Sequence, residues 1–143
     1  MNRIRILLVD DSELLRRALR ALLGRQSDME IVGDTGDGAD AVRLLETVSA
    51  DVVLLDMTMP GLSGADTALR IKETVPGAKI LVFSGNERLD HVRQMLSAGA
   101  DGYARKTAPP DELARAIRRV HAGERYIDAA LEKKLRERPE EGA

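Results

Sequence analysis

The sequence predicts an α/β fold, a doubly wound parallel sheet with helices on both faces, and two observations support this prediction. Five short apolar runs alternate along the chain with segments in which apolar residues recur at helical spacing. The runs are continuously apolar, which is typical of parallel strands that are covered on both faces. We therefore expect a flavodoxin-like fold: five parallel strands in the order 2-1-3-4-5, five helices, and a further linker-like helix at the C-terminal end.

Each expected element follows from its local pattern. Apolar runs predict strands at residues 4–11, 29–35, 51–57, 78–85 and 100–106. Helical periodicity predicts helices between and after them, at residues 12–26, 37–50, 64–77, 87–100 and 109–123. End signals support these limits, because Asp37 suits an N-cap, Pro110 suits a first turn, and Gly99 and Gly123 suit positions just past a helix.

The chain changes character after Gly123. The remaining segment is highly charged and has only a few apolar anchors, among them Leu131 and Leu135. Asp128 suits the N-cap of a short helix there. We expect two parts, a domain of residues 1–123 and a charged helix or tail of residues 124–143 that is a linker remnant or an extension.

The composition limits the classes of protein that need to be considered. The sequence has no cysteine, so disulfides and thiolate metal sites are excluded, and a reducing cytoplasm is the expected location. No apolar stretch approaches the roughly 18 residues that a membrane span needs. The net charge of −2 provides no general attraction to nucleic acid. We expect this chain to bind neither a membrane nor DNA directly.

Five polar residues lie where expected strands end: Asp10, Asp11, Asp56, Ser84 and Lys106. Ligands bind such sheets at the carboxyl ends of the strands, where strands 1 and 3 are neighbours about 4.8 Å apart. Three converging carboxylates repel one another unless a cation binds them, and Mg²⁺ binds carboxylate, water and phosphate oxygens. An ammonium and a hydroxyl suit phosphoryl oxygens, so the central carboxylate is a candidate phosphoryl acceptor.

These residues, with the segments "DMTMPGLSG" and "GADGYARK", resemble a two-component response-regulator receiver domain over roughly residues 3–123. The resemblance implies the following roles: Asp10 and Asp11 are the acidic pair that holds Mg²⁺, Asp56 is the phosphoacceptor and a metal ligand, Ser84 is the switch hydroxyl, and Lys106 is the family's lysine. The segment "AIRRVHAGERYIDAAL" resembles the LuxR/NarL-FixJ-type subfamily, in which a helix-turn-helix output domain follows the receiver. We expect that output domain to be lacking in this chain.

The resemblance also assigns roles near the site. It implies that Tyr103 is a switch aromatic and that the backbone carbonyl of Thr58 is a further metal ligand. It implies that Thr58 and Asn86 tune how fast the phosphoryl group hydrolyses. Neither side chain is an obvious general base, so we expect a phosphorylated state that lasts minutes or longer. The family usually has proline after the lysine, and Thr107 stands there instead, which leaves the geometry of the Lys106–Thr107 peptide open.

The function implied by the resemblance is a phosphorylation switch. A sensor histidine kinase donates a phosphoryl group to Asp56 with Mg²⁺, and a protein-interaction surface changes in response. The chain is then not an enzyme, apart from its own phosphorylation and dephosphorylation, and is expected to be part of a transcriptional regulator. The alternatives are a stand-alone receiver that acts by protein contact, homodimerisation included, and a degenerate module that is never phosphorylated.

Other interpretations of the same residues explain less of the pattern. Asp11 or Ser12 alone would suit the N-cap of a helix, but a cap does not explain the matching residues on other strands. A phosphatase of the haloacid-dehalogenase type also uses an aspartate nucleophile with Mg²⁺. That type of enzyme needs a second aspartate two residues after the nucleophile, where this sequence has Thr58. His91 and His121 are expected to be surface residues without a metal partner.

Overall fold

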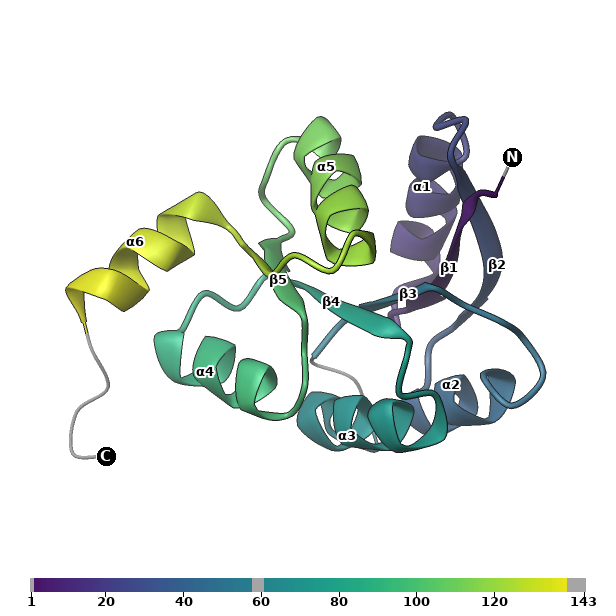
Figure 1. Ribbon diagram of the computed structural model, residues 1–143, viewed down its shortest axis with the longest axis horizontal. Helices are drawn as coiled ribbons and strands as arrows, with labels where there is room; N and C mark the ends of the chain where they lie inside the picture. The colour runs from purple at the N-terminus through teal and green to yellow at the C-terminus, as the bar shows by residue number, and fades with distance from the viewer. Residues whose placement is uncertain (1, 58–60, 139–143) are drawn as a thin grey trace.

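The computed structural model describes residues 2–57 and 61–138 and shows a parallel sheet between two layers of helices (Figure 1). The strands lie in the order β2-β1-β3-β4-β5-β6, and all neighbouring pairs are parallel. Their bounds are β1 Ile4–Val9, β2 Met29–Thr35, β3 Val52–Leu55, β4 Lys79–Ser84, β5 Gly102–Arg105 and β6 Tyr126–Ile127. The predicted order of the first five strands is confirmed, and β6 is an edge strand that the sequence did not predict.

Helices cover both faces of this sheet, as the continuous apolar runs predicted. They are α1 Glu13–Leu23, α2 Gly38–Leu44, α3 Gly64–Thr74, α4 Leu89–Ser97, α5 Pro110–His121 and α6 Ala129–Glu137. Helices α1 and α5 pack on one face, and α2, α3 and α4 pack on the other (Figure 1). Of these helices, none in the described part of the chain is both long and apolar enough to cross a membrane.

Side-chain caps explain where several helices begin. The Ser12 hydroxyl accepts a hydrogen bond from the amide of Leu15 at the start of α1, and the Asp37 carboxylate accepts from two amides at the start of α2. Helix α2 ends at Leu44, earlier than predicted, and the amides of Glu46 and Thr47 just beyond it bond three residues back, as in a tighter turn. The pairing of β1 with β3, in which Val9 lies opposite Leu55, places the ends of these two strands beside one another.

The core is almost entirely aliphatic, as the low aromatic content requires. Alternate residues of the central strands point to opposite faces, so Leu7 and Val9 of β1 join one cluster while Ile6 and Leu8 join the other. All four are buried. This double burial is what a parallel sheet between two helical layers requires, and it makes the carboxyl edge of the sheet a rigid support for the polar residues that follow it.

The segment after Gly123 is packed onto the sheet. Strand β6 pairs with β5, so that Tyr103 lies opposite Ile127. Helix α6 is capped by Asp128, whose carboxylate accepts a hydrogen bond from the amide of Ala130 at 2.9 Å. Leu131 is completely buried in the same cluster as α4. The predicted linker-like helix is present, and it forms part of the packed structure, while a domain boundary at residue 123 stays a prediction.

Candidate functional site

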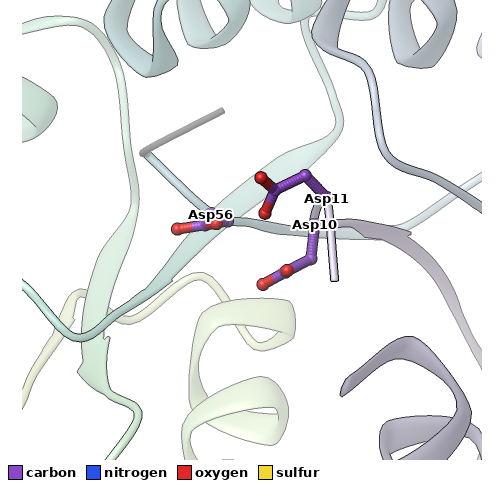
Figure 2. A group of neighbouring side chains, drawn as sticks. All are labelled: Asp10, Asp11 and Asp56. Atoms are coloured by element: carbon purple, nitrogen blue, oxygen red, sulfur yellow. The ribbon is translucent and has the colours of Figure 1, made fainter. Parts of the chain in front are cut away.

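Three carboxylates converge at the carboxyl edge of the sheet, between the ends of β1 and β3 (Figure 2). Asp10, Asp11 and Asp56 each have an oxygen that lies within 4.8 Å of the others. Asp10 is 4% exposed and Asp56 is 3% exposed, whereas Asp11 is exposed. The strand pairing produces this meeting, because the amide of Asp56 donates to the carbonyl of Val9 at 2.8 Å.

Lys106 supplies the positive charge that the cluster needs. Its Nζ lies 2.9 Å from Oδ2 of Asp10 and 3.6 Å from Oδ2 of Asp56. The residue immediately follows β5, and its amide donates to the carbonyl of Ser84 at 2.9 Å. Because two nearly buried carboxylates share one ammonium, the site has a net negative charge in the absence of another cation.

Ser84 ends β4 and is completely buried. Its hydroxyl oxygen accepts a hydrogen bond from the amide of Asn86 at 2.9 Å. The Asn86 side chain accepts from the amide of Arg88 at 3.0 Å and contacts Nδ1 of His91 at 2.7 Å. Asn86 therefore serves to shape the loop between β4 and α4, and His91, which we expected on the surface, is a half-buried partner in that loop.

Tyr103 is the largest completely buried side chain and points into the same region. Its hydroxyl donates to the carbonyl of Asn86 at 2.6 Å and contacts the sulfur of Met57 at 3.3 Å. Burial raises the pKa of Tyr103, and although the nearby Ser84 hydroxyl lowers it, the negative charge of Asp56 raises it further. The predicted switch aromatic thus bridges β5, the loop after β4 and the residue next to the candidate acceptor.

Two expectations about residues beside the site have different outcomes. Thr58, predicted to offer a metal-binding carbonyl and to tune hydrolysis, lies outside the described residues. The peptide bond between Lys106 and Thr107, which the sequence left open, is trans, since the described part of the chain contains no cis peptide bond.

The donor set at the acidic cluster fits Mg²⁺. Oxygen ligands of Mg²⁺ lie about 2.1 Å from the ion and hence up to about 4.2 Å from one another. The carboxylate oxygens at this site lie within 4.8 Å of one another, so small side-chain rotations satisfy that geometry. Asp10, Asp11 and Asp56 each offer carboxylate oxygens, which are the type of ligand that this ion prefers.

Two arginines near the site make contacts that could not be foreseen from sequence motifs. Arg16 of α1 reaches the backbone of Asp10. Arg105 lies between Glu87, at 3.5 Å, and Asp128, at 2.9 Å, and so links the loop after β4 to the start of α6. Arginines at ordinary helix and strand positions carry no recognisable signal, so only the structure shows which of them contact the site.

The family model and the relatives that match this chain all belong to one class of protein. A family model described as "Response regulator receiver domain" matches residues 6–118. The chain is 36% identical over 132 residues to the response regulator UvrY of Escherichia coli K12, covering 92% of this chain and 61% of that protein. It is 35% identical over 126 residues to the nitrate/nitrite response regulator protein NarL of the same organism, covering 88% and 58%. The chain thus spans about three fifths of these relatives.

Solved structures agree with this result. A two-component response regulator of the LuxR family from Aurantimonas sp. SI85-9A1 superposes with a TM-score of 0.91 at 31% identity, covering 95% of this chain and 97% of that one. The signal receiver domain of the putative response regulator NarL from Mycobacterium tuberculosis superposes with a TM-score of 0.81 at 28% identity, covering 87% and 100%. The match in both cases includes nearly the whole chain.

Proposed function

This chain belongs to the response regulator receiver family, and from this premise we propose that it is a phosphorylation switch in which Asp56 accepts a phosphoryl group. One observation carries the proposal. The carboxylate of Asp56 lies between two further carboxylates and an ammonium, at the edge of a sheet whose core is mainly aliphatic. A structural role does not explain three clustered acids, because like charges in a nearly buried position destabilise the fold.

The proposed donor is a phosphohistidine of a sensor histidine kinase. An Asp56 carboxylate oxygen attacks phosphorus, the phosphorus–nitrogen bond breaks, and the electron pair stays on the imidazole, which takes up a proton from solvent. Mg²⁺ held by Asp10, Asp11 and Asp56 would neutralise the charge of the transferring oxygens. Lys106 lies 3.6 Å from Asp56 and can bind a phosphoryl oxygen as the charge develops.

The switch follows from Ser84 and Tyr103. A phosphoryl oxygen on Asp56 is a stronger acceptor for the Ser84 hydroxyl than any neutral group, because its charge strengthens the hydrogen bond. Movement of Ser84 alters the loop that it holds through Asn86, and Tyr103 responds because its hydroxyl donates to the same residue. The phosphoryl group shifts this equilibrium only by the difference of its interactions with the two states.

The proposed setting is a cytoplasmic transcriptional regulator, since the chain resembles a LuxR-family response regulator and the response regulators UvrY and NarL. A stand-alone receiver that acts by protein contact remains the alternative. In either setting, we propose that catalysis is limited to the chain's own phosphorylation and dephosphorylation. We propose that the phosphorylated state lasts minutes or longer. The side-chain amide of Asn86 is held by contacts with Arg88 and His91, and it is no general base that could activate water.

The experiment is phosphorylation with acetyl phosphate, with the mass of the intact protein measured by mass spectrometry. We expect a gain of one phosphoryl mass that requires Mg²⁺ and is absent in Asp56→Asn. The matched control is Asp51→Asn, because Asp51 lies at the opposite end of β3. No gain in a folded wild-type protein, or an equal gain in Asp56→Asn, would refute the proposal.

A further inference from the structure

Arg16 connects three parts of the chain at the carboxyl end of β1. Its Nε donates to Oδ1 of Asp34 on β2 at 2.9 Å, and its Nη1 donates to the backbone carbonyl of Asp10 at 2.6 Å. The Arg16 side chain is only 18% exposed. The phosphorylation chemistry described above gives this residue no role.

The carbonyl that Arg16 holds belongs to the peptide unit between Asp10 and Asp11. A peptide unit is planar, so holding its oxygen orients the amide of Asp11 as well. The amide of Asp10 is held from the other side, where it donates to the carbonyl of Thr35 at 3.0 Å. The hydrogen bond from Arg16 and the one to Thr35 together hold the backbone at Asp10, from which the acidic pair extends.

The guanidinium has little freedom in this position. A Cβ atom at Gly36 would lie 3.1 Å from Nη1 of Arg16 and 3.3 Å from Cα of Asp11, so the loop after β2 packs closely over both. Burial acts to raise the pKa of Asp34, but hydrogen bonds from Arg20 and Arg16 outweigh it and hold this pKa below its usual value. Asp34 is therefore a charged anchor at neutral pH.

We infer that Arg16 is a positioning residue for the divalent-cation site: it orients the peptide unit between Asp10 and Asp11 so that both carboxylates meet Asp56. The inference rests on the proposed function, because it concerns the same cation site. Some residues orient metal ligands through hydrogen bonds without binding the metal themselves. Mutating such a residue typically weakens metal affinity by about 10–100-fold.

Arg20 provides a matched control. It lies one turn further along α1 and donates to the other carboxylate oxygen of Asp34, at 2.7 Å. Replacing either arginine by lysine keeps the charge but removes the planar fork that can donate to two acceptors at once. Arg16→Lys therefore removes the hold on Asp10 without changing the net charge near the acids, whereas Arg20→Lys perturbs only the shared partner, Asp34.

The test is calorimetric titration of the wild-type chain and both variants with Mg²⁺ alone, at fixed ionic strength. We expect the dissociation constant to rise about tenfold in Arg16→Lys and to change little in Arg20→Lys. With acetyl phosphate, the Mg²⁺ concentration for half-maximal labelling of Arg16→Lys should rise by the same factor, while its rate at saturating Mg²⁺ should match the wild type. A general structural defect would instead lower the labelling rate at saturating Mg²⁺.

Equal Mg²⁺ affinity in Arg16→Lys and the wild type would overturn the inference. An equal loss in Arg20→Lys would also overturn it, because the contact with Asp34 and not the contact with Asp10 would then be responsible. Loss of the circular dichroism spectrum in Arg16→Lys alone would assign the residue to folding and overturn it as well. If the wild type neither binds Mg²⁺ nor accepts a phosphoryl group, the proposed function fails instead.

Discussion

Replacing Lys106 by methionine should have opposite effects on Mg²⁺ binding and on phosphorylation. Lys106 Nζ lies 3.6 Å from Oδ2 of Asp56. A cation bound to that oxygen at about 2.1 Å would lie within about 6 Å of the ammonium. A unit charge and a divalent charge about 6 Å apart repel by ~1–2 kcal/mol even with the dielectric constant of water. Removing the ammonium should therefore tighten Mg²⁺ binding by roughly 5–30-fold.

Phosphoryl transfer should become slower in the same variant. Lys106 lies 3.6 Å from the acceptor Asp56, and loss of one group that stabilises developing charge typically costs about 100-fold or more in rate. The assays are calorimetric Mg²⁺ titration and acetyl phosphate labelling at saturating Mg²⁺. Lys133→Met is the control, since it removes one exposed charge on α6. Mg²⁺ affinity that is unchanged or weaker in Lys106→Met would refute the electrostatic reasoning.

Three further predictions concern stability. Leu131→Ala should lower the free energy of unfolding in urea by about 2–5 kcal/mol, because Leu131 is completely buried. A change below about 0.5 kcal/mol, the size of an ordinary surface substitution, would show that α6 does not unfold together with the rest of the domain. Gly64→Ala should cost about 1–3 kcal/mol, because its Cβ would lie 2.6 Å from Cα of Met57, and an unchanged urea midpoint would contradict this close packing. Burial, followed by the charge of Glu112, raises the pKa of Tyr126 to about 12. The raised value contributes stability below the unfolded pKa, near 10, and this stability is lost as the pH rises to about 12. Tyrosinate absorbance at about pH 10 in folded Tyr103→Phe, where Tyr126 is the remaining tyrosine, would contradict it.

The sheet and the main site residues could be predicted because their signals are local. The central strands β1, β3 and β4 are mainly apolar runs, and each run ends in, or is followed by, a polar residue whose type suggests a chemistry. The rule that parallel strands meet at their carboxyl ends was enough to bring Asp10, Asp56 and Lys106 together, and the structure confirms that they are neighbours. A family resemblance then indicated Ser84 and Tyr103, which lie in the same region.

The remaining features depend on contacts between distant segments. Strand β6 has only two residues, too few for any periodicity, and it exists because β5 offers an open edge. The burial of Leu131 depends on where α6 docks, which a largely charged helix does not reveal. Arg16 looks like any other arginine of an amphipathic helix, and only the fold shows that it reaches the carbonyl of Asp10.

The most direct test of the central claim is the identity of the residue that carries the phosphoryl group. After labelling with acetyl phosphate and Mg²⁺, borohydride reduces an aspartyl phosphate to homoserine, which remains as a permanent mark on the peptide. Peptide mass spectrometry should find homoserine at position 56, in the peptide that also contains Asp51 and Asp66 as internal controls. Homoserine at either of those positions, or at Asp10 or Asp11, would contradict the assignment of Asp56 as the acceptor.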